Sequence, residues 1–386
     1  QSAYRFRGGF RRTDGRPRFQ QSRSGIRQNQ LPADARDGAE RGRRNRQRGS
    51  GRRTAGITGQ ISFTDTKKPR DFPGLFCYNM VMKNTAIILG ATGNLAFALG
   101  VVLQGLKEYN NTLLAESDIF IYYQNMDEPT RRSLGNILPC QFLSYKFPYM
   151  KNMRPHILRD YGEMTFVRYE CFRYLKNYEY VLWLDADILI QGDISGMRKQ
   201  IPHGIGFRRE YYGERVRVNF LADIPDFQMD APHYNAGIMA ISRALKNNPD
   251  ELADWCYQKT AEIGENLYYP DQGILLLLCQ HFNLKIDALD EKYNCEARRP
   301  HQPLRQAALV HAVGHRKFWK YYYFDKWFRF YKTGVESNGL VCQNNFSVFK
   351  KLGLLKYPLF QVAPNPAQYP IKFLTYLLRA CLHCNY

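Results

Sequence analysis

The sequence lacks an uninterrupted hydrophobic run long enough to cross a bilayer, which takes about 20 residues. Its longest apolar stretch, AIILGATGNLAFALGVVL at 86–103, is broken by glycine, threonine and asparagine. The composition changes between Gly90 and Asn94, so this stretch predicts a strand, a turn and a helix. The pattern of a secretory signal peptide is also missing from the start, which favours a cytoplasmic protein.

Cysteine is sparse and scattered, with nine residues in a chain of 386. An odd number in a chain of this length argues against a disulfide framework and favours a reducing compartment. Cys381 and Cys384 form a single C-x-x-C pair without a second pair or a histidine cluster beside it. A zinc site is therefore not expected.

Acidic residues are scarce at the beginning of the chain. Residues 1–70 hold 19 Lys and Arg against 5 Asp and Glu, and the rest holds 36 against 30. Such a composition predicts a disordered Arg-rich leader over residues 1–79. Three interpretations stay open: an RNA-binding tail, a targeting segment, or sequence that is not native, because Met80 and Met82 directly precede the first predicted strand.

From about residue 84 apolar patterns typical of strands and helices alternate, which predicts an α/β fold with a mostly parallel central sheet. The predicted strands are 84–91, 117–123, 141–147, 180–190, 233–242, 284–290 and 308–313, and the predicted helices are 95–109, 162–178, 250–267 and 271–282. In such sheets ligands bind beyond the carboxyl ends of the strands.

Two aspartates interrupt one of these strands, in VLWLDADILI at 181–190. In an extended strand, residues two apart point to the same face, so Asp185 and Asp187 are expected side by side. Two adjacent carboxylates repel each other, and a divalent cation removes the conflict. The alternative is a pair of solvated turn residues.

Three later segments combine polar residues with glycine at the expected ends of elements: HYNAG at 233–237, YPDQG at 269–273 and HAVGHRK at 311–317. In the last of them His311 could provide a third metal ligand, Gly314 allows close approach of a phosphate, and Lys317 supplies a positive charge. The polar residues of HYNAG and YPDQG suit recognition of sugar hydroxyl groups, although either segment alone is better explained by ordinary turn and capping chemistry.

Together with VLWLDADILIQGD, the segments YNAGIMAIS, PDQGIL and HAVGHRKFW resemble the motifs of glycosyltransferase family 8, in the same order, between about Asn84 and Lys332. The resemblance implies a single Rossmann-like nucleotide-sugar transferase domain of the GT-A type. It also implies a retaining transfer of galactose or glucose from a UDP-sugar to a saccharide or lipid-linked saccharide, as in bacterial lipopolysaccharide or capsule synthesis.

The resemblance further implies the roles of individual residues. Mn²⁺ or Mg²⁺ would be held by Asp185, Asp187 and His311. The nucleotide-sugar would contact Asn94, Arg168, Ala186, Gly314 and Lys317, and the sugar pocket with the reacting centre would contain Asn235, Asp271 and Gln272. The segment GATGNLA departs from the family pattern, which has an acidic residue near Thr92 or Gly93 and an aromatic residue at Leu95.

Two other functions compete with this interpretation. Gly90-x-x-Gly93 between a strand and a helix is similar to the nucleotide turn of short-chain dehydrogenases, which are NAD(P)-dependent oxidoreductases. Those enzymes need a Tyr-x-x-x-Lys pair, and the pair at Tyr322 and Lys326 falls in the aromatic tail. The second alternative is an RNA-associated protein that binds through the Arg-rich leader, so nucleic acid is an expected partner only if the leader is native.

The segment KFWKYYYFDKWFRFYK at 317–332 combines ten aromatic and five basic residues. We expect residues 80–316 to form the catalytic domain and 317–386 to form a C-terminal region that contacts the acceptor or an anionic membrane surface at the inner face of the cytoplasmic membrane. The alternative is an aromatic cap that packs on the catalytic domain.

Overall fold

The computed structural model describes residues 83–342, except 150–152, 211–212, 298–303, 305, 316 and 320–321, and it also describes 363–364. The predictions for residues 1–79 and for Cys381 and Cys384 lie outside these residues. The described residues all belong to one unit, Phe76–Tyr386.

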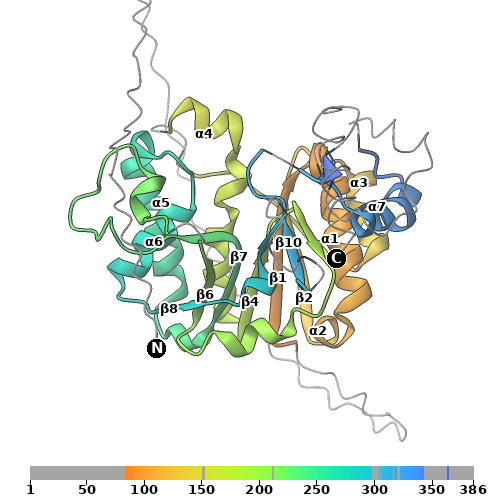
Figure 1. The fold of residues 1–386 in the computed structure, drawn as a ribbon, viewed down its shortest axis with the longest axis horizontal. Coiled ribbons are helices and arrows are strands. Elements are labelled where there is room, and N and C mark those ends of the chain that lie inside the picture. Colours follow the sequence, from red (N-terminus) through yellow and green to blue (C-terminus); the bar gives the residue numbers. More distant parts are fainter. Residues whose placement is uncertain are drawn as a thin grey trace, which may run out of the picture. The chain divides into compact units, whose positions relative to one another are not determined.

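A seven-stranded sheet organises this unit, with the strand order β3-β2-β1-β4-β7-β6-β8 (Figure 1). Only the two pairs that involve β7 are antiparallel, so the mostly parallel sheet is confirmed. Its strands are β1 Thr85–Thr92, β2 Ser117–Gln124, β3 Gln141–Ser144, β4 Tyr180–Leu184, β6 Ile205–Arg209, β7 Tyr234–Ser242 and β8 Ile286–Ala288.

Strand β1 shows why the central strands read as continuous apolar runs. Its side chains alternate between the two faces of the sheet, and both faces are covered by helices. Ile87 and Leu89 belong to one hydrophobic core, whereas Ala86 and Ile88 belong to the other. The sheet is therefore buried on both sides.

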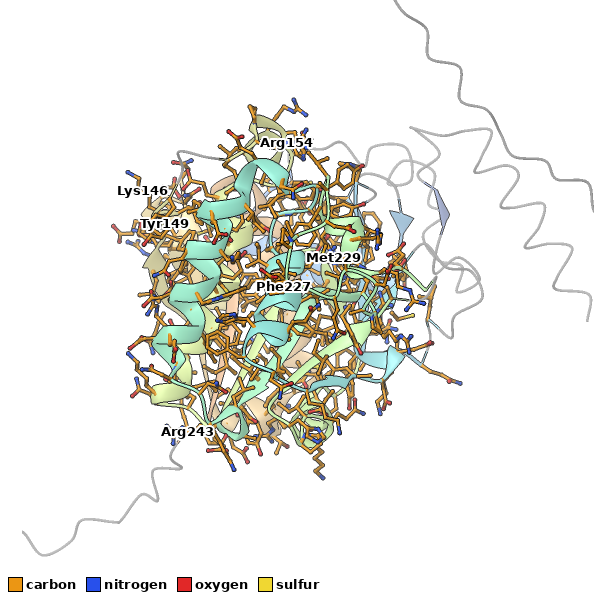
Figure 2. All side chains as sticks on the ribbon, turned by 90° about the vertical axis from the view of Figure 1, so that its left-hand side faces the viewer. Lys146, Tyr149, Arg154, Phe227, Met229 and Arg243 are labelled. Carbon is orange, nitrogen blue, oxygen red and sulfur yellow. The ribbon has the colours of Figure 1, made fainter. Side chains whose placement is uncertain are left out.

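Helices form a layer on each face of the sheet (Figure 1). Helices α1, α3 and α7 cover one face, and α5, α6 and the 3-10 helix η2 cover the other; Figure 2 looks onto this second layer, with Arg154 at its upper edge and Arg243 at its lower edge. The α-helices are α1 Ala96–Tyr109, α2 Asn111–Ala115, α3 Glu128–Ile137, α4 Pro155–Asp160, α5 Pro249–Ile263, α6 Gln272–His281 and α7 Asp325–Phe330.

Short 3-10 helices and one π-helical turn connect these elements. They are η1 Gly93–Leu95, η2 Glu163–Lys176, η3 Ser195–Gln200, η4 Val216–Asn219, η5 Arg243–Leu245, η6 Gly264–Asn266, η7 Glu291–Tyr293, the π-turn η8 Tyr331–Val335 and η9 Glu336–Asn338. Segment 162–178 is thus helical as predicted, although its hydrogen bonds are of the 3-10 type.

The single strand predicted at 180–190 is wrong. Strand β4 ends at Leu184, a turn contains Asp185 to Asp187, and β5 Ile188–Ile190 starts a second sheet with the order β5-β10-β9. The other strands of that sheet are β9 Cys295–Glu296 and β10 Leu309–His311. The aspartates consequently lie in a turn where the chain changes sheets, and they do not share one face of an extended strand.

The aromatic segment after Lys317 packs on the helix layer of α1. Phe318, Trp327 and Tyr331 are buried in the same hydrophobic core as α1, and Phe97 of α1 meets the rings of Trp327 and Tyr331 edge to face at 6.4 and 6.3 Å. These rings therefore form an aromatic cap on the domain. Strands β11 Tyr322–Tyr323 and β12 Ala363–Pro364 form a two-stranded ladder.

No helix within the described residues combines the length and the apolar composition that a membrane span needs. The stretch 86–103 consists instead of β1, the turn η1 and most of α1, as its composition predicts.

Candidate active site

The turn between β4 and β5 brings two carboxylates to the histidine at the end of β10. Nε2 of His311 lies 3.2 Å from Oδ1 of Asp187 and 3.8 Å from Oδ2 of Asp185. Antiparallel pairing of β10 with β5 sets this distance, because His311 lies opposite Ile188. The three residues that the sequence predicts as metal ligands are therefore together in the structure.

One oxygen of each carboxylate faces His311, and the other oxygen is bound by donor groups of the protein. Oδ1 of Asp185 accepts hydrogen bonds from Nε1 of Trp183 at 2.7 Å and from Arg168 at 2.9 Å. Oδ2 of Asp187 forms an ion pair with Lys317. The second oxygens, Oδ2 of Asp185 and Oδ1 of Asp187, are the ones that face His311.

Charge and burial act differently on the two carboxyl groups. Burial raises the pKa of Asp185, Arg168 opposes it, and the neighbouring Asp187 adds to the increase, so the pKa lies above its ordinary value. Burial also acts to raise the pKa of Asp187, but Lys317 and His311 outweigh it and hold that pKa below its ordinary value.

The cluster needs a residue without a side chain at position 237. A Cβ atom on Gly237 would lie 2.1 Å from Cε1 of His311 and 2.9 Å from Oδ2 of Asp185. The carbonyl oxygen of Gly237 also accepts a hydrogen bond from the backbone N–H of Asp185 at 3.0 Å. Strand β7 therefore approaches the cluster too closely for any other residue at this point.

Arg168 links the cluster to the start of α6. Its guanidinium lies 2.6 Å from Oδ2 of Asp271, 2.9 Å from Asp185 and 2.7 Å from the carbonyl oxygen of Ala236. The other oxygen of Asp271 accepts a hydrogen bond from Thr165 at 2.8 Å. Asp271 directly precedes α6, whose first residue is Gln272. Arg168 thus joins Asp271 to Asp185, and Gln272 follows Asp271 in the chain.

Asn235 lies on strand β7, like Gly237, and is connected to His311 through the side-chain amide of Asn294. Its Nδ2 donates to Glu210 at 3.0 Å, and its Oδ1 accepts from Asn294 at 2.9 Å. The Oδ1 of Asn294 lies 3.0 Å from Nδ1 of His311. We did not predict Glu210 or Asn294 from the sequence, because neither stands in a recognisable local pattern. The contact of Trp183 with Asp185 could have been predicted, because residues two apart along a strand point to the same face.

The remaining predicted contacts are on the loops around the cluster. Ala186 is the middle residue of the turn and packs against a hydrophobic core. Gly314 follows β10 with a φ of +76°, a conformation that favours glycine. Besides pairing with Asp187, Lys317 donates to the carbonyl oxygen of Ala312 at 3.0 Å. Of these three residues, Lys317 contacts a carboxylate directly, Ala186 lies between the two aspartates in the chain, and Gly314 lies in the loop between β10 and Lys317.

Asn94 is the exception among the predicted residues. It is exposed in η1, and in the part of the chain described here its hydrogen bond is to Thr92 and not to the acidic cluster. Packing explains the glycine at the neighbouring position 93, because a Cβ there would lie 2.0 Å from the carbonyl oxygen of Asn125. The glycines of the GATGNLA turn therefore do not require a dinucleotide.

The donor set fits a divalent cation. The ligand atoms of Asp185, Asp187 and His311 lie within 4.8 Å of one another. Two carboxylate oxygens and one imidazole nitrogen suit Mn²⁺, Mg²⁺ and similar ions, and three protein ligands leave coordination positions for a substrate. A second group with similar spacing is formed by Glu210, Glu214 and His233.

A mostly parallel sheet, covered by helices on both faces and bearing an acid–acid–imidazole cluster next to its central strand, defines an α/β protein of the GT-A nucleotide-sugar transferase class. The model of the family "Glycosyl transferase family 8" matches residues 86–322, more than half of the chain. The chain therefore belongs to glycosyltransferase family 8.

Three solved structures illustrate what this chain is similar to. The bifunctional glycosyltransferase WbbM matches with a TM-score of 0.50 and 11% identity over 70% of this chain and 52% of its own. The galactosyltransferase LgtC in complex with donor and acceptor sugar analogues matches with a TM-score of 0.49 and 16% identity over 66% of this chain and 100% of its own. The glycosyltransferase GlyE of Streptococcus pneumoniae TIGR4 gives 0.46 and 17% over 67% and 62%.

A search of curated protein sequences gives no match. The family match includes the GATGNLA turn, so it accounts for the segment that suggested an oxidoreductase. Glycosyl transfer is thus the activity of the class.

Proposed function

We propose that this chain is a retaining hexosyltransferase that moves galactose or glucose from a UDP-sugar to a hydroxyl group of a saccharide or a lipid-linked saccharide, in a reaction that depends on Mn²⁺ or Mg²⁺. One observation carries the proposal: Oδ2 of Asp185, Oδ1 of Asp187 and Nε2 of His311 converge while Arg168, Trp183 and Lys317 hold the other carboxylate oxygens. This arrangement leaves three oriented ligand atoms for one cation.

The bound cation would neutralise Asp185 and Asp187 and share the negative charge of the donor diphosphate. Lys317 would leave Asp187 and donate to a phosphate oxygen, where negative charge grows as the bond to the sugar breaks. Gly314 and Ala186 would place backbone groups against the same diphosphate. Asn94 would contact the nucleoside, and its exposure in η1 leaves it accessible for that contact.

The sugar would lie between the carboxylates and the start of α6. Asp271 and Asn235 have side chains fixed by hydrogen bonds, so they suit recognition of sugar hydroxyl groups. Arg168 positions Asp271 and Asp185 relative to each other. Gln272 would offer its amide oxygen to the anomeric carbon as positive charge develops there, although an amide is a poor nucleophile.

Retention of configuration would follow from attack on the same face as the leaving group. The bond between the anomeric carbon and the diphosphate oxygen breaks, the acceptor oxygen forms the new bond, and the acceptor proton passes to the leaving phosphate. No protein base is needed for this step. Gln272 and Asp271 hold the sugar in place during the exchange, which is where orientation contributes most to the rate.

We propose that residues 80–316 form the catalytic domain and that residues 317–386 form a C-terminal region. We also propose that the enzyme works in a reducing, cytoplasmic setting. The setting is supported by the free thiols of Cys140, Cys171, Cys256 and Cys279. Arg329 and Lys332 are exposed on the aromatic cap, where each pairs with a carboxylate, Glu108 and Glu336 respectively. An anionic acceptor or headgroup would compete with these carboxylates for the two cations, whereas the buried rings beneath them do not insert into lipid.

Release of UDP from a panel of nucleotide-sugars tests the proposal. UDP-galactose or UDP-glucose should be hydrolysed slowly with Mn²⁺ and not with EDTA, and an acceptor should accelerate the reaction. NMR of the product should show the anomeric configuration of the donor. Inversion, or equal rates in EDTA, would contradict the proposal, and binding of NADPH in preference to UDP would favour the oxidoreductase alternative.

A further inference from the structure

The histidine of the cluster is held by a buried chain of polar side chains that continues away from the carboxylates. It runs from Glu210 through Asn235 and Asn294 to His311, with heavy-atom distances of 3.0, 2.9 and 3.0 Å. All four side chains are buried, and Asn294 has no exposed surface. Hydrogen bonds in such an environment must be satisfied with the correct polarity, because unpaired groups are costly.

Two independent partners of Asn235 fix the direction in which these hydrogen bonds are donated. Glu210 pairs with Arg208, whose Nη2 lies 3.2 Å from Oε2, and a carboxylate can only accept from the amide of Asn235. At the other end of the amide, the backbone N–H of Gly237 can only donate, and it lies 3.1 Å from Oδ1 of Asn235. Asn235 therefore has a single consistent orientation.

The remaining orientations follow from that one. Because Oδ1 of Asn235 accepts, Asn294 must turn its Nδ2 toward it and its Oδ1 toward His311. An amide oxygen can only accept, so Nδ1 of His311 must carry a proton. A neutral ring then has its lone pair on Nε2, which is the nitrogen that faces Asp185 and Asp187.

We propose that Asn294 is a positioning residue for the metal site, which fixes the Nδ1–H tautomer of His311 and so presents Nε2 as a ligand before the cation arrives. The inference rests on the proposed function, because it assumes that the cluster binds a divalent cation. It also links the metal to the donor sugar, since Asn235, which we assign to the sugar pocket, is the next member of the chain.

The test begins with the tautomer in the unaltered protein. In metal-free protein at a pH where the ring is neutral, ¹⁵N–¹H spectra of the eight histidines should show His311 protonated on Nδ1, with the resonance assigned from the variant His311→Gln. A proton on Nε2 in the unaltered protein overturns the proposal without any further variant.

Two substitutions then separate positioning from packing. Asn294→Leu has a similar shape and no hydrogen bonds; it should lose the preference for Nδ1–H and weaken Mn²⁺ binding, measured by electron paramagnetic resonance of free Mn²⁺, about 10- to 100-fold. Asn294→Asp can still accept from Nδ1–H, so it should keep the tautomer and bind Mn²⁺ more tightly than the Leu variant. Equal affinity and an unchanged tautomer in a folded Leu variant would overturn the proposal.

A buried asparagine elsewhere provides the matched control. Asn110 is 2% exposed, and its side chain bonds the backbone at Gly192 and Ile194. Asn110→Leu should lower stability but leave the His311 tautomer and Mn²⁺ affinity unchanged; a similar loss of affinity would mean that general destabilisation explains the effect. Failure of the unaltered protein to bind Mn²⁺ at all would instead contradict the proposed function, because the tautomer is measured without metal.

Discussion

The imidazole of His311 and the carboxylate of Asp187 face each other, with 3.2 Å between Nε2 and Oδ1. One residue ends β10 and the other precedes β5, so the pairing of these two short strands creates the contact. The geometry of the proposed metal site is therefore a direct product of the small second sheet, and changes that disturb this sheet are expected to act on metal binding.

Gly237→Ala should disrupt the metal site from a neighbouring strand. The added Cβ would lie 2.1 Å from Cε1 of His311, so the ring or strand β7 must move. Because ligand distances are restrictive, we expect Mn²⁺ affinity to fall at least about tenfold. Gly135→Ala in α3 is the control, since nothing lies within 4 Å of the added atom and a helical alanine should be neutral or stabilising. Equal Mn²⁺ affinity in both variants would contradict the account.

Asp185→Asn should make the metal-free protein more stable while removing metal binding. The folded pKa of Asp185 is raised by burial and by Asp187, despite Arg168. The stability that such a group contributes is present at low pH and is lost as the pH rises from its unfolded value of 3.8 through the folded pKa. At pH 7 the ionised form therefore destabilises the apo fold. Each kcal/mol of destabilisation that the substitution removes should raise Tm by about 2 °C.

Thermal unfolding in EDTA tests the predicted increase in Tm, and Asp118, a carboxyl group whose pKa is shifted in the opposite direction, provides the comparison. Burial acts to raise the pKa of Asp118, but hydrogen bonds from Lys83 and Tyr178 outweigh it, so the pKa is lowered. This group stabilises the fold above its unfolded pKa, and its contribution is lost as the pH falls through the folded pKa. Asp118→Asn should lower Tm at pH 7, whereas Asp185→Asn should raise it; a decrease for both would be inconsistent with the proposed electrostatics.

Lys317→Met should slow the reaction without weakening the metal site. Methionine keeps the apolar part of the side chain and removes the charge that pairs with Asp187. Without that charge on the leaving diphosphate, kcat should fall about 10²- to 10³-fold, while Mn²⁺ should bind as well or better because Asp187 has lost a competing cation. Lys259→Met on α5, where the ammonium pairs with Glu262, is the control and should keep the full rate. An unchanged kcat in Lys317→Met would exclude its role.

Gln272→Ala should reduce transfer more than donor binding. Gln272 opens α6 next to Asp271, and its amide is assigned to the anomeric carbon in the transition state. Loss of one preorganised polar group predicts a decrease in kcat of about 100-fold, with the affinity for UDP unchanged. Gln258→Ala, at an exposed position of α5, should have the activity of the unaltered enzyme. Full activity in Gln272→Ala would eliminate the assignment.

The sequence predicted the central strands and the helices α1, η2, α5 and α6, because these strands are apolar on both faces and these helices have a clear apolar pattern. Helices α2, α3 and α4 were not predicted. The prediction failed at 180–190, where Leu184 and Ile188 look like parts of one strand although the chain changes sheets between them. Apolar composition does not record which sheet a strand joins. The short strand β6 was missed because its five residues include Arg208 and Arg209.

The site was predicted to a similar extent. Asp185, Asp187 and His311 were found because motif spacing identifies them, and the structure brings them together. Asn294 and Gly237 were missed as neighbours of the Asp185–Asp187–His311 cluster, since their importance depends on contacts across strands: a hydrogen bond to His311 in one case and the absence of a Cβ atom in the other. Composition alone likewise does not show that Trp327 faces the core, so the packing of the aromatic segment on the domain was left as an alternative, and its contact with a membrane surface stays a prediction.

Release of UDP from UDP-galactose and UDP-glucose by the unaltered enzyme and by His311→Ala, each with Mn²⁺ and with EDTA, tests the central claim most directly. The account predicts metal-dependent release by the unaltered enzyme, and release at least 100-fold slower in the variant, since loss of one of three ligands removes most of the metal affinity. If His311→Ala releases UDP at the full rate with Mn²⁺, or if EDTA leaves the unaltered enzyme fully active, the cluster of Asp185, Asp187 and His311 is not a catalytic metal site.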